Sequence, residues 1–569
     1  MSRFRQRAVF ATICTGALAL WGLRGDGQTP RAPGLDVDRP VGERGREQTA
    51  SPARIVVDRF APPAIERGIS PLEARAPGSP EELQRRSLRP ASKVIDRVGK
   101  SGSVYVPGRV IVKFKDGASP ASRASAMSAA SRTASLSSRP SSANFDVVSI
   151  ARDEDAEAVA LAFRGRPDVE YAQAAYRVHT QFVPNDRFYA QGLQWSFPMI
   201  DMERAWDIQP QAGSSITVAV VDTGVAYTNV TMHFHADAFR VDSKGHTGPV
   251  DGSGTLFPSL GDLTLSFVAA TELGPSSRFV APHDFIWDDA TPIDLDGHGT
   301  HVSGTIGQLT NNGANGLGDA RNGGGTAGIA FNVKIMPVKV IDSDWDDIFG
   351  SPNQGTDDVV ARGVRYAADN GAKVVNLSIG RTGEPAPVVE DAIKYAVSKG
   401  AFVAIAAGND FKDGNPTEVI AEIATRVQGA VSVAAVDRNK NHASYSSSGS
   451  WVELAAPGGE FGSFGAEGGI LQQTLDLDLV ETFTLPLAQF TAPRFDVLAY
   501  FYFTGTSQAT PHVSGVAAML MQQGITNPAA VEAALEKFAT DLGPPGRDAT
   551  FGFGLIEARN ALHGLGLAR

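Results

Sequence analysis

Three segments that lie far apart in the chain carry the side chains that acyl transfer needs. An apolar run ends on Asp222, His298 opens a stretch of small residues, and Ser507 opens a second such stretch. A serine hydroxyl is barely ionised at neutral pH, so it needs a base within hydrogen-bond reach to become a nucleophile. A histidine can take that proton, and a carboxylate can hold the imidazole in the required tautomer. The three segments therefore predict a site that attacks a carbonyl carbon.

These side chains can meet only if rigid elements bring them together. Short apolar runs without alternation, typical of strands buried on both faces of a parallel sheet, occupy residues 216–221, 333–340, 374–377, 402–406 and 430–436. Helix candidates stand at residues 356–370, 387–399 and 507–523. This alternation predicts an α/β fold with a doubly wound, mostly parallel sheet. Ligands bind beyond the carboxyl ends of such strands, and Asp222, Ser378 and Asn409 each come at or after a predicted strand end.

The order of the acid, the base and the nucleophile is typical of one family. The segments that contain them read VDTG at 221–224, HGTHVSG at 298–304 and GTSQATPHVSG at 505–515. In order and local sequence they resemble the subtilisin-like serine peptidases. The resemblance spans residues 104–565. It implies a subtilisin-like fold that hydrolyses peptide bonds through an acyl-enzyme intermediate. It also implies that Asn409 and the backbone N–H of Ser507 donate to the developing oxyanion.

The resemblance also implies a set of substrate-binding residues, which are Ser378, Ile379, Gly380, Ala407 and Gly408. The first three belong to a segment that resembles the edge on which an extended peptide pairs by its backbone. The last two would form the facing wall of the pocket for the side chain before the scissile bond. Small residues on both walls predict room for a large apolar side chain. We therefore expect a broad-specificity endopeptidase with an apolar preference, although no residue of the pocket floor can be identified.

Three segments precede the predicted catalytic domain, which covers residues 181–565. Arginines ahead of an apolar run predict a signal peptide in residues 1–23, with a retained membrane anchor as the alternative. Residues 24–103 are rich in Pro, Arg and Gly, which predicts a disordered linker. Residues 104–180 show a small α+β pattern that resembles the inhibitory propeptide of the same family. By that resemblance, the chain's own propeptide would inhibit the enzyme until the chain cuts itself near residues 176–184.

Composition limits the class of protein and its partners. Hydrophobic residues make up 42% of the chain and charged residues 20%, as in a soluble globular protein. Residues 1–100 carry 18 Lys and Arg against 11 Asp and Glu, whereas the whole chain has a net charge of −11, so the predicted folded part is acidic. This charge argues against a nucleic-acid partner. We expect a secreted monomer that acts on polypeptides and has no membrane partner after signal removal. Its only cysteine, Cys14, lies in the predicted signal peptide.

No cofactor is implied for the chemistry, but the resemblance implies a possible structural calcium ion. Asp186 and the loop at residues 309–313 resemble places where relatives supply oxygen ligands. The loop continues into a Gly- and Asn-rich stretch up to Gly325, so the ligand set stays open. Two further segments, residues 235–282 and 459–503, interrupt the alternation of strands and helices and are predicted to be surface insertions.

A different class of function remains as an alternative, namely a catalytically silent binding or adhesion protein on the same scaffold. The complete set of acid, base and nucleophile favours the enzyme. A fluorophosphonate probe separates the two hypotheses, because it labels an activated serine and leaves an inert one unmodified.

Overall fold

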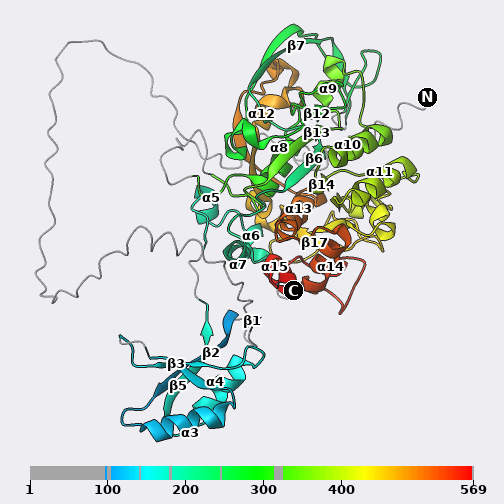
Figure 1. The fold of residues 1–569 in the computed structure, drawn as a ribbon. Coiled ribbons are helices and arrows are strands. Elements are labelled where there is room, and N and C mark those ends of the chain that lie inside the picture. Colours follow the sequence, from blue (N-terminus) through cyan, green and yellow to red (C-terminus); the bar gives the residue numbers. More distant parts are fainter. Residues whose placement is uncertain are drawn as a thin grey trace, which may run out of the picture. The chain divides into compact units, whose positions relative to one another are not determined.

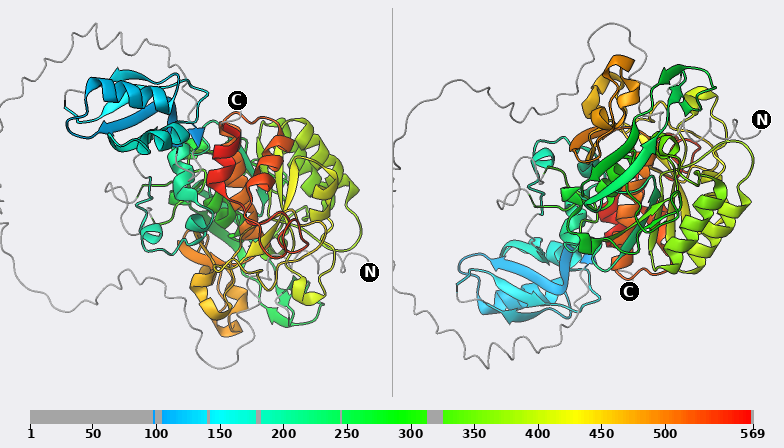
Figure 2. Two further views of the ribbon diagram at one scale, coloured as in Figure 1. Left: turned by 90° about the horizontal axis from the view of Figure 1, so that it is seen from below. Right: turned by 90° about the horizontal axis from the view of Figure 1, so that it is seen from above.

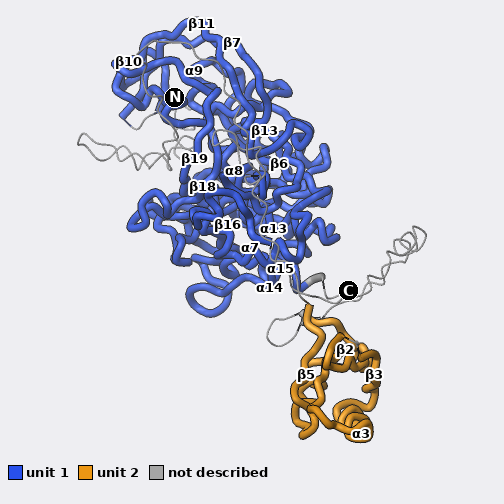
Figure 3. The backbone as a smooth tube through the Cα atoms, turned by 90° about the vertical axis from the view of Figure 1, so that its left-hand side faces the viewer, with its two compact units in different colours: residues 1–34, 179–569 blue, residues 35–178 orange. Residues whose placement is uncertain are grey.

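The computed structural model describes residues 97–98, 104–139, 142–177, 182–243, 246–312 and 325–566. They fall into two compact units, drawn in different colours in Figure 3. The smaller unit lies within residues 35–178, and most of the larger one lies within residues 179–569. The predicted signal peptide and nearly all of the predicted linker lie outside the described residues.

The smaller unit is a five-stranded antiparallel sheet with two helices. Its elements are β1 (Arg97–Val98), β2 (Val104–Phe114), α3 (Pro120–Ala130), β3 (Ser135–Ser138), β4 (Asp146–Ser149), α4 (Ala156–Arg164) and β5 (Val169–Tyr176). Strand β2 alternates, so that Val110, Val112 and Phe114 point to the core. Helix α4 buries Val159 and Phe163 against them, which gives this unit a hydrophobic core of its own.

Seven parallel strands form the central sheet of the larger unit, within the part of the chain that the structure describes. In sheet order they are β12 (His283–Asp284), β13 (Lys334–Lys339), β6 (Thr217–Asp222), β14 (Val374–Leu377), β15 (Phe402–Ala406), β16 (Ala430–Val436) and β17 (Leu454–Pro457). All neighbouring pairs run parallel. The carboxyl ends of these strands therefore share one edge of the sheet.

Helices cover both faces of this sheet (Figure 1). One layer contains α8 (His298–Gly307), α13 (Thr506–Gln522), α14 (Pro528–Phe538) and α15 (Ala558–Gly566), and the other contains α10 (Asp357–Asp369) and α11 (Pro387–Ser398). Along β6, Val218 and Val220 belong to the first core, whereas Ala219 and Val221 belong to the second. Because each face of β6 contacts a hydrophobic core, its successive inner positions must all be apolar. The predicted α/β class is confirmed.

The two predicted insertions form hairpins that pack on each other (Figures 1 and 2). The first begins before the predicted boundary at residue 235, with β7 (Val230–Ala236), and continues through β8 (Phe239–Val241), β9 (Thr247–Gly248), β10 (Thr255–Phe257) and β11 (Gly261–Phe267). The second contains β18 (Ile470–Leu475), α12 (Leu477–Val480) and β19 (Leu498–Phe503). The rings of Phe257 and Phe490 lie 5.0 Å apart, and Phe267 stacks on Phe495 at 4.9 Å. Aromatic contacts thus join segments that are far apart in sequence.

Short helices complete the larger unit. Ahead of β6 stand α5 (Arg187–Ala190), α6 (Ser196–Met199) and α7 (Met202–Ile208), and α9 (Asp344–Phe349) follows β13. Within the described ranges, no helix combines the length and the apolar character that crossing a bilayer requires.

Candidate active site

Asp222 and His298 meet in a hydrogen bond at the edge of the sheet. Asp222 is the last residue of β6, and His298 is the first residue of α8. Nδ1 of His298 lies 2.7 Å from Oδ1 of Asp222, and both side chains are buried. A methyl group on Gly299 would lie 2.1 Å from the carbonyl oxygen of Gly224, so glycine is needed for α8 to approach the end of β6 this closely.

The loop before α8 is held by the buried carboxylate of Asp294. This carboxylate accepts hydrogen bonds from the backbone of Asp296, Gly297 and Thr300. The hydroxyl of Thr300 donates to it as well, at 2.5 Å. Asp294 therefore orders the start of α8, the helix that carries His298.

Carboxylates around His298 control its charge. Burial alone would lower the pKa of His298, but the charge and hydrogen bond of Asp222 raise it, with further contributions from Asp296 and Asp294. The net effect raises the pKa of His298 to about 9. The surrounding carboxylates thus favour the imidazolium form of His298.

Ser507 stands at the start of α13 and is tied to the loop after β14. Its hydroxyl donates to the carbonyl oxygen of Ser378 at 3.0 Å, and the hydroxyl of Ser378 donates to the carbonyl oxygen of Ser507 at 2.8 Å. Helix α13 packs against α8 and against β14 and β15. The structure therefore joins Asp222 to His298 directly, whereas it directs the Ser507 hydroxyl to Ser378 rather than to the imidazole.

Asn409 follows β15 and is oriented by the start of α13. Its Oδ1 accepts hydrogen bonds from the backbone N–H of Thr506 at 2.9 Å and from the Thr506 hydroxyl at 3.0 Å. The same hydroxyl accepts a hydrogen bond from the backbone N–H of Gly408. Because the amide oxygen is engaged in this way, the amide nitrogen of Asn409 is left as the donor on its other side.

A pocket lies beside Ser507, and nine residues line it: Ile379, Gly380, Ala406, Gly408, Asn409, Asp410, Glu418, Thr506 and Ser507. Three of the five residues expected to bind substrate are among them. The other two are Ser378, which holds Ser507, and Ala407, whose carbonyl oxygen accepts a hydrogen bond from Trp451.

Two carboxyl groups in this pocket were not found from the sequence. Asp410 follows Asn409 directly, and Glu418 is 1% exposed. Burial raises the pKa of both, that of Glu418 to about 8. Glu418 lies in an irregular loop before the 3₁₀ helix η4 (Ala421–Arg426), where no periodicity or motif marks it.

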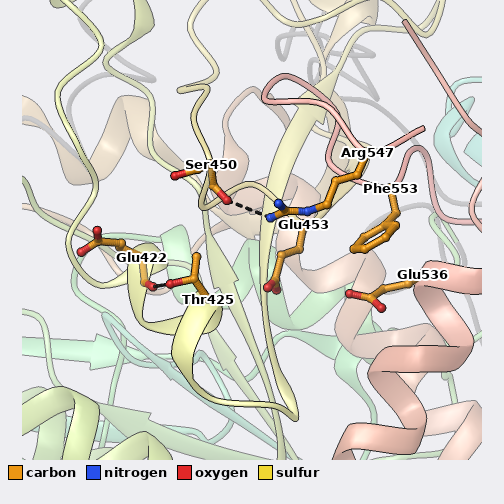
Figure 4. Close-up of a pocket in the computed structure, with 7 residues that line it drawn as sticks. All are labelled: Glu422, Thr425, Ser450, Glu453, Glu536, Arg547 and Phe553. Carbon is orange, nitrogen blue, oxygen red and sulfur yellow. Dashed lines mark hydrogen bonds between the residues drawn. The ribbon is translucent and has the colours of Figure 1, made fainter. Parts of the chain in front are cut away.

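A second pocket shares no residue with the first (Figure 4). It is lined by Glu422, Thr425, Ser450, Glu453, Glu536, Arg547 and Phe553. Arg547 donates to the carbonyl oxygen of Ser450 at 2.8 Å. None of the residues predicted to act in catalysis lines this pocket, which leaves the pocket beside Ser507 as the candidate active site.

Asp186 and residues 309–312 of the predicted calcium loop lie next to one another, and residue 313 lies outside the described residues. Oδ2 of Asp186 accepts a hydrogen bond from the backbone N–H of Asn311 at 2.9 Å. Oδ1 of Asp186 and Oδ1 of Asn312 are buried and have no hydrogen-bond partner in the described part of the chain. Such oxygens fit a hard cation, which takes six to eight oxygen ligands. Among residues 97–98, 104–139, 142–177, 182–243, 246–312 and 325–566, no group of three or more His, Cys, Asp or Glu is arranged to hold a metal.

Comparison with known proteins identifies a family for each unit. Residues 213–554 match the model of the subtilase family, and residues 92–174 match that of the fervidolysin N-terminal prodomain. A thermophilic serine proteinase of Bacillus sp. strain AK1 is 30% identical over 465 residues, or 82% of this chain and 90% of the relative. Thermitase of Thermoactinomyces vulgaris is 30% identical over 64% of this chain and 94% of its own length. An extracellular protease of Xanthomonas campestris pv. campestris is 27% identical over 81% of this chain and 75% of its own length.

Proposed function

Because the chain belongs to the subtilase family and is a subtilisin-like serine endopeptidase with a prodomain, we propose that Asp222, His298 and Ser507 form its catalytic triad. One observation carries this proposal: the buried 2.7 Å hydrogen bond between Asp222 and His298 at the sheet edge. The packing of α13, which carries Ser507, against α8, which carries His298, supports it further.

The proposed reaction begins with rotation of the Ser507 hydroxyl from the Ser378 carbonyl to the imidazole. Because Nδ1 of His298 faces Asp222, Nε2 is the nitrogen that takes the serine proton. The serine oxygen then attacks the carbonyl carbon of the peptide, and the protonated imidazole returns the proton to the leaving amine. A water molecule, deprotonated by His298, hydrolyses the acyl-enzyme and regenerates Ser507.

Two donors would stabilise the oxyanion that forms at each attack. These are the amide nitrogen of Asn409 and the backbone N–H of Ser507 at the start of α13. The hydrogen bonds from Thr506 support this role, since they fix the Asn409 side chain before substrate arrives. We expect Asn409→Ala to lower kcat by about 10²–10³, the range known from subtilisin for the loss of one such donor.

The zymogen organisation is proposed on the match to a prodomain family. The smaller unit would act as an intramolecular inhibitor, and the enzyme would remove it by its own activity. Secretion is proposed from the predicted signal peptide and is supported by an extracellular relative. Polypeptides are the proposed substrates.

A structural calcium ion is proposed at Asp186 and the loop at residues 309–313. The buried unpartnered oxygens of Asp186 and Asn312 support it, because unsatisfied buried oxygens are costly unless a ligand binds them. The ion would tie the loop to the segment before α5 and would take no part in the chemistry.

The catalytic proposal is tested with a fluorophosphonate probe and an unrelated peptide substrate. The mature enzyme is expected to be labelled once per chain at Ser507. Its rate of peptide hydrolysis should decrease in proportion to the fraction of chains that are labelled. Ser507→Ala is expected to be unlabelled and inactive, and Ser514→Ala, seven residues later in the same helix, serves as the matched control that keeps labelling. Peptide hydrolysis that survives in Ser507→Ala would contradict the proposal, and an unlabelled, inactive wild type would favour a silent binding protein.

A further inference from the structure

Glu418 places a carboxyl group in the wall of the pocket beside Ser507. Its side chain is 1% exposed, and one carboxyl oxygen accepts a hydrogen bond from the backbone N–H of Arg381. Its other neighbours in the pocket include Gly380, Gly408 and Asp410. A buried carboxyl group is costly in its charged form unless a cation or several hydrogen-bond donors accompany it.

No cation of the described chain forms an ion pair with Glu418. The charge of Arg381 acts on Glu418, but the guanidinium of Arg381 donates from Nε and Nη2 to the two carboxylate oxygens of Asp357, at 2.7 and 2.5 Å. Asp410 adds a second carboxyl group to the pocket and raises the pKa of Glu418 further. The pocket therefore holds acidic groups that the protein itself leaves without a counterion.

Glycines in the two walls of the pocket pack closely against Glu418. A methyl group added to Gly380 would lie 2.6 Å from Oε1 of Glu418, so any other residue at this position would press on the carboxyl group. On the facing wall, the same addition to Gly408 would lie 3.3 Å from Cβ of Glu418. The absence of side chains at the two glycines thus lets the carboxyl group of Glu418 line the pocket between them.

We propose that this pocket selects a lysine or arginine side chain immediately before the scissile bond, and that Glu418 is the residue that determines this specificity. The inference rests on the proposed catalytic role of Ser507, since it concerns the pocket beside that residue. It revises the apolar preference expected from the small wall residues alone, because those residues carry no charge and Glu418 was not identified from the sequence.

A cationic side chain would supply the missing counterion. Burial raises the pKa of Glu418, backbone hydrogen bonds from Arg381 and Ile420 and the Arg381 charge oppose this rise, and Asp410 adds to it, so that the pKa is about 8. An ammonium or guanidinium group in the pocket favours the ionised carboxylate, so binding releases a proton. The preference for a basic over an uncharged side chain should therefore increase as the pH rises from 7 to 9.

The experiment compares p-nitroanilide peptides that differ only in the residue before the scissile bond. Lysine and norleucine form the main pair, because they match in length and differ in charge, and phenylalanine reports an apolar preference. The measured quantity is kcat/KM for the lysine substrate divided by kcat/KM for the norleucine substrate. An effect on the catalytic step that is the same for both substrates cancels in this ratio. Active enzyme is counted with the fluorophosphonate probe, so misfolded protein does not enter the ratio.

We expect mature enzyme at pH 9 to prefer lysine over norleucine by about ten- to a hundredfold, as for other charge-recognising pockets. Glu418→Gln keeps an oxygen for the Arg381 N–H and should reduce the ratio to about one. Glu422→Gln, on η4 and outside this pocket, is the matched control that keeps the ratio.

Two results would overturn the inference: a labelled wild type that cleaves norleucine or phenylalanine as well as lysine, or a lysine preference that survives Glu418→Gln. A wild type that the probe does not label would overturn the proposed role of Ser507 as well. The two failures are therefore distinguishable.

Discussion

At the scale of single residues, His298 is the proposed general base, so the charge of its imidazole would decide when the site can work. A general base must be unprotonated to accept the serine proton. Asp222, Asp296 and Asp294 together outweigh burial and raise the pKa of this imidazole to about 9. We therefore infer that kcat/KM for an uncharged substrate increases with pH up to the alkaline range.

Asp296→Asn tests this electrostatic control. The substitution removes one negative charge near His298, and the asparagine oxygen can still accept the hydrogen bond that Asp296 receives from the backbone N–H of His298. The folded-state pKa of the imidazole should decrease, so the midpoint of the pH–kcat/KM curve should move to lower pH by about one unit. The measurement is kcat/KM for the norleucine substrate between pH 6 and 10.

Asp288→Asn serves as the control for that prediction. Asp288 is an exposed residue earlier in the same chain segment, where it pairs with Arg362, and it is not among the carboxylates that contribute most to the pKa of His298. Its midpoint should stay at the wild-type value. A midpoint in Asp296→Asn that equals the wild type would contradict the proposed role of the Asp296 charge.

The sequence predicts a site residue only where a recognisable local pattern surrounds that residue. Asp222, His298 and Ser507 each stand in a recognisable run of apolar or small residues, whereas Glu418 stands in an irregular loop. The role proposed for Glu418 depends on its burial beside Gly380. This neighbour is 38 positions away in the sequence, and only folding brings the two residues into contact. The hydrogen bond from Ser507 to Ser378 is equally a product of the fold.

At the scale of elements, periodicity predicted the central sheet but not the hairpins. Strand β6 is apolar on both sides because it faces two cores, and this leaves a continuous run that can be recognised in the sequence. Strands β7 and β11 pair antiparallel, with one side exposed. Strand β11 lies inside a segment predicted only as an insertion, and β7 begins five residues before that segment. Their packing depends on aromatic contacts with residues about 230 positions away, such as Phe267 with Phe495, and no local pattern encodes these.

The loop at residues 309–313 yields a prediction on metal removal. If calcium binds the native enzyme at Asp186 and this loop, it stabilises the folded state by an amount that depends on its free concentration. Chelation with excess EGTA should lower the Tm of the mature, inhibitor-blocked enzyme by roughly 5 °C, and added calcium should restore it. Thermal unfolding followed by circular dichroism measures both changes.

Asp186→Asn should make the Tm insensitive to EGTA, because it removes the charged ligand whose Oδ1 has no partner. Asp207→Asn is the matched control, since Asp207 accepts a hydrogen bond from the backbone N–H of Phe182 in the same N-terminal segment and is not among the residues proposed to hold calcium. It should keep the full response to EGTA. An equal response in Asp186→Asn and the wild type would place any calcium elsewhere.

At the scale of the whole molecule, two units with separate cores are joined by a segment in which the chain is proposed to cut itself. Strand β5 of the smaller unit ends at Tyr176, and the larger unit begins near residue 179. The α+β character of the smaller unit could be predicted because each of its strands and helices has a recognisable pattern within its own segment of the sequence. The boundaries of the linker and signal peptide rest on composition alone.

The pocket specificity and the zymogen proposal together predict where the chain is cut. Arg177 is the only lysine or arginine in residues 171–186, so a pocket that selects a basic side chain would cleave after it. N-terminal sequencing of the mature enzyme should then begin at Val178, and Ser507→Ala should remain uncut because it lacks the nucleophile.

Arg177→Gln should slow processing at least tenfold, whereas Arg187→Gln, which lies beyond the junction, should process normally. Release of an enzyme that begins at Arg177, after the aromatic Tyr176, would show instead that the pocket accepts an apolar side chain, and cleavage of purified Ser507→Ala would show that another peptidase performs the step.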